Sequence, residues 1–276
     1  TDQRSFGDVA TAPKGGIKDP YTGETLVAEG AQSYLLARYV FNLIVKSAWT
    51  TGEPGIFFVD EANRHNPVPH MGAYRATNPC GEIPLLDYDV CNLGSINVGA
   101  FAHEGELYDW AGLAKVVRLA VRFLDNVIDA NKYPLPEIEN LAQRIRRIGL
   151  GVMGYADTLV RLGISYDSDK AITFAKRLMS FIETESHAAS ANLADTRGAF
   201  PEWESSVWGP DATCARNDRG VRIRPYLRLR HCNITAIAPT GTISMIAGCS
   251  SGIEPLFAVA FARRHADGGI KALDIN

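Results

Sequence analysis

Residues 78–97 of this chain read NPCGEIPLLDYDVCNLGSIN. An amide, a thiol and a carboxylate stand at alternate positions, in Asn78, Cys80 and Glu82, and a second thiol follows at Cys91. The proline disfavours the α region for the residue before it, and glycine is a poor helix residue, so an extended backbone is expected. In an extended segment the three side chains share one face, about 6.6 Å apart along the strand. We interpret this stretch as an active-site strip.

A plainer interpretation of the same residues is also open. A lone cysteine is usually a small buried hydrophobic residue, and an NPCG stretch can form a simple turn. A distant segment, residues 238–244 (APTGTIS), favours the catalytic interpretation. It follows the β-prone run 233–238 and precedes apolar residues, so a strand, a turn and a helix start are expected.

A helix start at residues 238–244 would present free backbone N–H groups, which favour an anion. Thr240, Thr242 and Ser244 can add hydroxyl donors. No Gly-Lys-Ser/Thr follows, so the segment is not a Walker-type loop. An ordinary capped helix would explain the same residues without a ligand.

Four motifs in the same order resemble the large catalytic chain of ribonucleotide reductases, and most nearly its adenosylcobalamin-dependent branch (class II). They are Thr77–Leu85 (TNPCGEIPL), Cys91–Val98 (CNLGSINV), Arg147–Gly154 (RIGLGVMG) and Ala238–Pro255 (APTGTISMIAGCSSGIEP). Shorter matches are Asp19–Glu24 (DPYTGE), Gly55–Asp60 (GIFFVD) and Asn63-Arg64. The resemblance therefore covers nearly the whole chain.

The resemblance implies an α/β fold that is the second half of a ten-stranded α/β barrel, with a finger loop carrying the radical cysteine. Residues 1–30 are then a surface lead-in loop, and residues 31–276 form the C-terminal half of the catalytic barrel. Chains of this family are much longer, so we expect a fragment or one product of a split gene. The first half of the barrel, with its effector-binding loops and the partner of Cys91, would lie upstream. The C-terminal tail that delivers reducing equivalents would also be missing.

The implied function is the radical-based reduction of ribonucleotides to 2′-deoxyribonucleotides. By resemblance, Cys80 becomes a thiyl radical that removes the 3′-hydrogen, Glu82 takes the 3′-hydroxyl proton, and Asn78 hydrogen-bonds the sugar hydroxyls. Cys91 is one of two thiols that reduce the intermediate and end as a disulfide, which an external dithiol reduces again. The implied phosphate-binding residues are Pro239, Thr240, Gly241, Thr242, Ile243 and Ser244.

The same resemblance indicates the cofactor and partners. The NPCGE form favours adenosylcobalamin as the radical source, and a separate metal-containing radical subunit is the alternative. The expected substrate is a ribonucleoside diphosphate or triphosphate, and the expected reductant is a thioredoxin- or glutaredoxin-type or other dithiol. The expected assembly is a homodimer completed by the missing N-terminal half. Allosteric control is left open.

Composition agrees with a cytoplasmic enzyme: 46% of the residues are hydrophobic and 21% are charged, close to globular averages. The formal charge of −3 is spread along the chain, so no nucleic-acid partner is expected. No apolar run approaches the roughly 20 residues of a membrane span, and no signal peptide opens the chain. Cysteines at positions 80, 91, 214, 232 and 249 fit no disulfide scaffold, and no motif indicates a metal site.

Hydrophobic periodicity predicts long helices alternating with short buried strands, which is typical of parallel-sheet α/β proteins, here as one domain. The predicted helices are 31–50, 108–130 and 168–195, and the predicted strands are 55–59, 149–153 and 234–238. Residues 199–224, with their Trp, Pro and Arg side chains, are expected to be irregular.

Two rival functions follow from other observations. Gly149–Gly154 (GLGVMG) fits the G-x-G-x-x-G pattern of a dinucleotide-dependent dehydrogenase, with Asp167 or Asp169 as a possible ribose-binding acid. However, the preceding residues 141–147 read as an amphipathic helix and not as the strand that such a fold requires. We interpret the glycines as close-packing positions on a barrel strand. The other rival is a non-catalytic half-barrel that only completes a partner chain.

Overall fold

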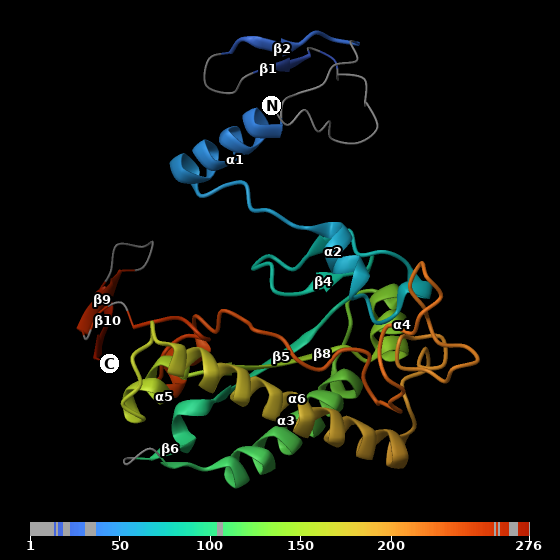
Figure 1. Cartoon of the computed structure of the whole chain (residues 1–276), viewed down its shortest axis with the longest axis vertical. Helices are drawn as coiled ribbons and strands as arrows, with labels where there is room; N and C mark the ends of the chain where they lie inside the picture. Colours follow the sequence, from blue (N-terminus) through green and yellow to red (C-terminus); the bar gives the residue numbers. More distant parts are fainter. Residues whose placement is uncertain are drawn as a thin grey trace. The chain divides into compact units, whose positions relative to one another are not determined.

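The computed structural model describes residues 14, 16–18, 23–30, 37–103, 107–256, 258, 260–264 and 270–275 (Figure 1). The chain divides into two compact units, Thr1–Phe57 and Phe58–Asn276. The first unit contains an antiparallel hairpin of β1 (Ile17–Lys18) and β2 (Thr25–Val27), followed by helix α1 (Ala37–Thr51). The predicted lead-in loop thus contains a hairpin in its described part, and the predicted helix 31–50 is described from residue 37 onward.

The second unit is mixed α/β, as the sequence predicts. Its elements are α2 (Val59–Arg64), η1 (Pro69–Met71), β3 (Ala76–Thr77), β4 (Pro84–Leu85), β5 (Asn92–Asn97), η2 (Val98–Phe101), β6 (Ala102–His103), β7 (Leu107–Tyr108), α3 (Trp110–Ala130), α4 (Pro136–Ile145), β8 (Ile148–Met153), α5 (Tyr155–Arg161), α6 (Asp169–Arg197), α7 (Ile243–Ala247), β9 (Ala260–Arg264) and β10 (Ile270–Ile275). Strands β5 and β8 pair in parallel, and the other described pairs are antiparallel. Each sheet in the described residues has two strands, so no closed sheet is present there.

The core lies between the β5–β8 pair and two long helices, α3 and α6, which pack against each other. Every residue of β8 is buried. Leu113, Val117 and Val121 place one apolar face of α3 in this core, at the spacing that the sequence shows. Helix α3 begins where the Asp109 side chain accepts a hydrogen bond from the Gly112 N–H, and a similar cap opens α6. The predicted helices 108–130 and 168–195 are therefore confirmed within two residues at each end.

Two of the three predicted strands differ from the structure. Residues 53–58 have no regular secondary structure, and no described strand pairs with them, so the strand predicted at 55–59 is wrong. The predicted strand at 234–238 forms only an isolated parallel bridge between Leu150 and Thr235. The hydrogen bonds between this segment and β8 are irregular. The N–H groups of Ile148 and Leu150, two residues apart, donate to the carbonyls of residues 233 and 234, which are adjacent, whereas in a regular ladder the two acceptors would also be two residues apart.

Glycines in β8 allow the neighbouring chains to approach closely. A Cβ on Gly151 would lie 2.3 Å from the carbonyl oxygen of Ala236, and a Cβ on Gly149 would lie 2.6 Å from a methyl carbon of Leu93. These glycines lie inside the strand, and helix α4 precedes it, whereas the dinucleotide pattern requires a turn after a strand. The close-packing interpretation is therefore confirmed, and the dehydrogenase interpretation is wrong.

A buried ion-pair network, which we call the Asp125 network, ties together parts of the second unit that are distant in sequence. The fully buried carboxylate of Asp125 accepts hydrogen bonds from Arg146 at 2.6 Å and Arg197 at 2.7 Å. Arg230 and His231 each place a nitrogen 3.2 Å from the same carboxylate. The network joins α3, α6 and the turn before β8 to the end of the irregular segment that contains residues 199–224.

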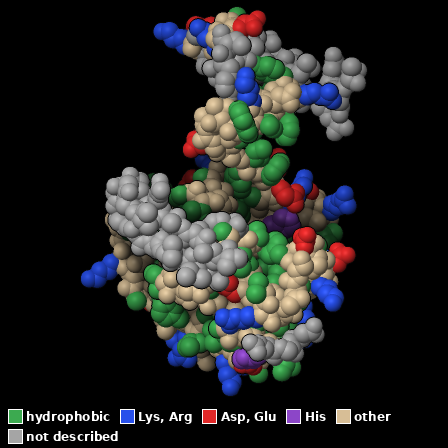
Figure 2. Space-filling view, turned by 90° about the vertical axis from the view of Figure 1, so that its left-hand side faces the viewer, with side chains coloured by type: hydrophobic (Ala, Val, Ile, Leu, Met, Phe, Trp, Pro, Cys, Tyr) green, Lys and Arg blue, Asp and Glu red, His purple; other side chains and the backbone are tan. Residues whose placement is uncertain are grey.

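The molecular surface carries both signs of charge. Among the side chains coloured in Figure 2, Lys and Arg are scattered among Asp and Glu and form no continuous basic patch. None of the described helices is both long and apolar enough to cross a membrane. The described residues also contain no group of three or more His, Cys, Asp or Glu side chains placed to hold a metal ion.

Candidate active site

The NPCGE residues form the tip of a hairpin, not an extended strip. Strands β3 and β4 pair antiparallel, with Thr77 opposite Pro84. Between them the Gly81 N–H donates to the Asn78 carbonyl at 3.0 Å, and the Ile83 N–H donates to the Asn78 side-chain oxygen at 3.0 Å. The prediction of extended geometry is therefore wrong. The reason is that proline is well suited to the second position of a turn, and Gly81 supplies the positive φ (87°) that reverses the chain.

The hairpin tip exposes one reactive group and buries another. The thiol of Cys80 is exposed, and Cys80 forms no disulfide. The Oε2 atom of Glu82 is buried and has no hydrogen-bond partner among the described residues. A buried carboxylate oxygen without a donor is costly, so this atom is available to a donor from a ligand or from another part of the protein.

Cys91 lies at the start of β5, half-buried and free. The pKa of its thiol is raised to about 12: burial is the largest cause, the charges of Asp89, Cys232 and Glu82 act in the same direction, and the positive charge of Arg147 opposes them. The charge of Glu82, nine residues earlier in the sequence, is thus one of those that oppose ionisation of the Cys91 thiol.

The segment predicted to bind phosphate is a tight turn followed by a short helix, α7. Thr240 is buried in a left-handed conformation (φ 56°), and its hydroxyl accepts a hydrogen bond from the Gly252 N–H at 2.7 Å. The buried Ser244 hydroxyl lies 3.0 Å from that of Ser251. Two of the three predicted hydroxyl donors therefore hold the loop itself in place. The N–H groups of residues 241–243 have no backbone acceptor in the described part of the chain.

The loop and Cys91 lie at opposite ends of β8. Cys91 adjoins the residue before β8, whereas the Gly154 N–H just after β8 donates to the Ser250 carbonyl at 2.8 Å. Ser250 and Gly252 belong to the turn that packs against the loop. Six residues of strand span about 20 Å, which sets the scale of the separation.

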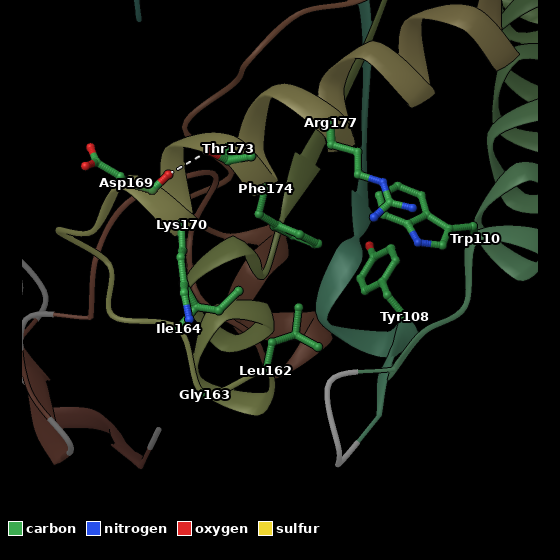
Figure 3. Close-up of a pocket in the computed structure, with 10 residues that line it drawn as sticks. All are labelled: Tyr108, Trp110, Leu162, Gly163, Ile164, Asp169, Lys170, Thr173, Phe174 and Arg177. Atoms are coloured by element: carbon green, nitrogen blue, oxygen red, sulfur yellow. Dashed lines mark hydrogen bonds between the residues drawn. The ribbon is translucent and has the colours of Figure 1, made fainter.

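A separate cavity of about 520 Å³ lies between the β7–α3 corner and the start of α6 (Figure 3). Tyr108, Trp110 and Phe174 line it, and the guanidinium carbon of Arg177 lies 4.4 Å from the Trp110 ring centroid. These aromatic rings also contact one another at the edge of the core. Asp169, named only in the dehydrogenase interpretation, lines this cavity, but none of the residues predicted for ribonucleotide reduction does, so we assign it no part in the chemistry.

The structure also shows site residues that the sequence reasoning missed. Arg147 is 3% exposed, and its guanidinium is paired with Asp89 at 2.9 Å and donates to the Tyr74 hydroxyl at 3.2 Å. The sequence does contain a signal for a buried ion pair: two adjacent arginines directly precede a fully apolar strand, and an arginine buried there needs an acidic partner. That signal does not identify Asp89, which lies 58 residues away.

Comparison with known proteins gives consistent matches. A sequence model described as "Ribonucleotide reductase, barrel domain" matches residues 18–276. The vitamin B12-dependent ribonucleoside-diphosphate reductase of Thermoplasma acidophilum is 47% identical over 240 residues, which cover 87% of this chain and 29% of that protein. The protein of the same name from Mycobacterium tuberculosis is 49% identical over 227 residues, which cover 82% of this chain and 30% of that protein. The ribonucleoside-diphosphate reductase subunit alpha of Chlamydia trachomatis is 35% identical over a region that covers 90% of this chain and 26% of that protein. The chain thus spans less than a third of each relative.

Proposed function

The chain belongs to the ribonucleotide reductase family, and from this premise we propose that it carries the radical, base and reducing residues for converting ribonucleotides to 2′-deoxyribonucleotides. One observation carries the proposal. The hairpin that exposes the Cys80 thiol also holds a buried oxygen of Glu82 that has no hydrogen-bond partner among the described residues. A sugar held there can present a hydroxyl to Glu82 and a carbon-bound hydrogen to Cys80.

In the proposed reaction, the Cys80 thiyl radical removes the 3′-hydrogen of the ribose. Glu82 takes the 3′-hydroxyl proton, within the hydrogen-bond reach that general base catalysis requires. The 2′-hydroxyl then leaves as water, and Asn78 holds the sugar through hydrogen bonds. Two thiols, Cys91 and one outside this chain, supply two electrons and two protons and become a disulfide, and Cys80 returns the hydrogen to the 3′-carbon and becomes a thiyl radical again. The sum is ribonucleotide plus dithiol giving deoxyribonucleotide, water and disulfide.

Adenosylcobalamin is the radical source that we propose, because two relatives are named as vitamin B12-dependent. When bound, it would supply the radical chemistry that removes the hydrogen atom from the Cys80 S–H group. The exposed position of Cys80 at a hairpin tip fits this role, since a thiol that exchanges hydrogen with a bound group must be reachable. A separate metal-containing radical subunit is the alternative source.

The substrate phosphates would bind at residues 239–244, where three backbone N–H groups have no backbone acceptor in the described structure. We further propose that residues 31–276 form the C-terminal half of an α/β barrel. Strands β5 and β8 pair in parallel, Thr235 forms a parallel bridge to Leu150, and the helices α3 and α6 pack against one face of the pair. The other face, with Cys91 and the β8 glycines, would line the barrel interior. An N-terminal half, a dithiol reductant and a second copy complete the proposed assembly.

Ribonucleotide reduction in a reconstituted complex tests this function. The chain would be combined with the N-terminal half of a vitamin B12-dependent relative, dithiothreitol and adenosylcobalamin, with ribonucleoside diphosphates and triphosphates as parallel substrates. We expect deoxyribonucleotide that forms only when the cobalamin is present, measured by chromatography. A folded complex that forms no product under any of these conditions would instead favour a non-catalytic half-barrel.

The Glu82→Gln variant tests the base. We expect kcat to fall roughly 10²-fold, because glutamine keeps the shape of the side chain and cannot accept the proton. Glu61→Gln is the control, since Glu61 lies exposed on α2 and pairs with Arg64. It should retain the activity of the unaltered complex. Near-normal activity in Glu82→Gln would show that another group takes the proton.

A further inference from the structure

The Arg147 guanidinium is a buried cation whose hydrogen bonds are incomplete. Its Nε donates to Asp89 Oδ2 at 3.0 Å, and its Nη1 donates to the Tyr74 hydroxyl at 3.2 Å. Its Nη2 lies 2.9 Å from Asp89 Oδ2 but makes no hydrogen bond with any described residue. The Nη2 group of Arg147 can therefore interact with a further electron-rich partner.

Cys91 is placed to be that partner. In the parallel β5–β8 pair Asn92 lies opposite Ile148, so Cys91 lies opposite Arg147 on the neighbouring chain. Side chains alternate along a strand, so residues 147 and 149 share a face. The Cys91 sulfur lies on that face, 3.0 Å from the point where a Cβ on Gly149 would stand. The Cys91 thiol and the Arg147 side chain therefore come from opposite positions on the same face of the β5–β8 pair.

We propose that Arg147 is a positioning residue for Cys91, and that its guanidinium stabilises the Cys91 thiolate released when the Cys91 disulfide is reduced. This inference rests on the proposed function only in assigning that disulfide. The effect of the Arg147 charge on the Cys91 thiol does not depend on that assignment and can be measured on the folded chain itself.

The step that Arg147 assists is a thiol–disulfide exchange. A thiolate of the external dithiol attacks the sulfur bonded to Cys91, a new mixed disulfide forms, and the bond to Cys91 breaks. The electron pair of that bond stays on the Cys91 sulfur, which leaves as a thiolate and later takes a proton from water. The second thiol of the reductant then resolves the mixed disulfide. A thiol of lower pKa leaves faster, and a thiolate buried without a cation is costly.

The charges around Cys91 identify Arg147 as the residue whose substitution tests the proposal. Burial is the main cause that raises the pKa of Cys91 to about 12, and the positive charge of Arg147 opposes that rise. Asp89 from the same loop, Cys232 from the segment beside β8 and Glu82 from the hairpin all act against the thiolate. Removing the guanidinium should raise the pKa of Cys91 further.

Residue-resolved alkylation of the folded chain tests the proposal without turnover or cofactor. The rate of Cys91 alkylation by iodoacetamide would be followed by peptide mass spectrometry from pH 7 to 10, in a Cys80→Ser background. Below the thiol pKa this rate is proportional to the thiolate fraction. We expect Arg147→Gln to slow it about tenfold or more at each pH, because a nearby opposite charge shifts a pKa by a unit or more. Arg147→Lys, which keeps the charge, should restore most of the rate.

Arg146→Gln is the matched control. Arg146 is the adjacent buried arginine, yet it pairs with Asp125 in a different network. It should change the Cys91 rate less than about threefold, since it contributes no charge beside the thiol. An unchanged or faster rate in folded Arg147→Gln, or an equal slowing in Arg146→Gln, overturns the proposal.

Asp89→Asn keeps the proposal testable if Arg147→Gln does not fold. Asparagine retains an oxygen that can accept the Val90 N–H, as Asp89 does at 2.8 Å. It removes the carboxylate and leaves Arg147 in place, so Cys91 should be alkylated about tenfold faster. No increase would overturn the proposal. Because alkylation is independent of catalysis, a normal result here with no ribonucleotide reduction would count against the proposed function alone.

Discussion

The Cys80→Ser variant of the reconstituted complex should form deoxyribonucleotide at least on the order of 10⁴-fold more slowly than the unaltered complex, as when a reacting side chain is removed from other enzymes. Serine has nearly the same shape and keeps the hairpin turn, in which the Cys80 side chain makes no hydrogen bond within the described structure. However, its O–H bond is much stronger than an S–H bond, so the oxygen-centred radical is not accessible. The measurement is the initial rate of product formation.

A second cysteine serves as the control for Cys80. Cys249 is free and half-buried, and its pKa is raised by burial, so it resembles Cys91 in environment but lies after α7. Cys249→Ser should retain activity within about threefold, as expected for a substitution away from the reacting groups. If Cys80→Ser kept more than about a hundredth of the activity, the hairpin thiol would not be the radical site.

The long helices were predictable because their signal is local. In α3 the residues Leu113, Val117 and Val121 return to one face every three or four positions, and that face is the one buried against the strands. Strand β8 was also predictable, since every residue in it is apolar or glycine and every residue is buried. The strand predicted at 55–59 failed because a strand forms only with a paired neighbour, and no described strand pairs with that segment.

The residues of the candidate site could be named from the sequence by resemblance, but their geometry could not be predicted. Asn78, Cys80 and Glu82 form one functional group of residues by resemblance, and the same five letters fit a strand or a turn. The choice was made by the pairing of β3 with β4, in which Asn78 closes the turn on Ile83. A local rule that places alternate side chains on one face does not apply once the chain reverses.

Arg147 illustrates a second limit of sequence reasoning. It belongs to the motif RIGLGVMG, yet the motif does not reveal that its guanidinium meets Asp89 and Tyr74 or lies beside Cys91. Those contacts join residues 56 to 73 positions apart, and they depend on the parallel register of β5 and β8. Only the folded chain shows that this charged residue next to a buried strand lies opposite Cys91.

Replacing Asp125 with asparagine should lower the free energy of unfolding by about 3–5 kcal/mol, the usual cost of removing one partner from a buried ion pair. Burial alone would raise the pKa of Asp125, but hydrogen bonds from His231 and Arg146 outweigh it and hold the pKa well below its usual value. Asparagine keeps the shape but leaves the guanidinium groups of Arg146, Arg197 and Arg230 without their shared carboxylate. The measurement is urea unfolding at pH 7.

The neighbouring Asp129 provides the matched control. It accepts a hydrogen bond from the same Arg146 at 2.8 Å, but its side chain is 53% exposed. Water can replace that contact, so Asp129→Asn should cost about 1 kcal/mol or less. A loss of similar size in both variants would mean that Arg146 is held mainly from the solvent side. A loss confined to Asp125→Asn would show that the buried carboxylate joins α3 and α6 to the chain entering β8, and thereby supports the strand beside which Cys91 lies.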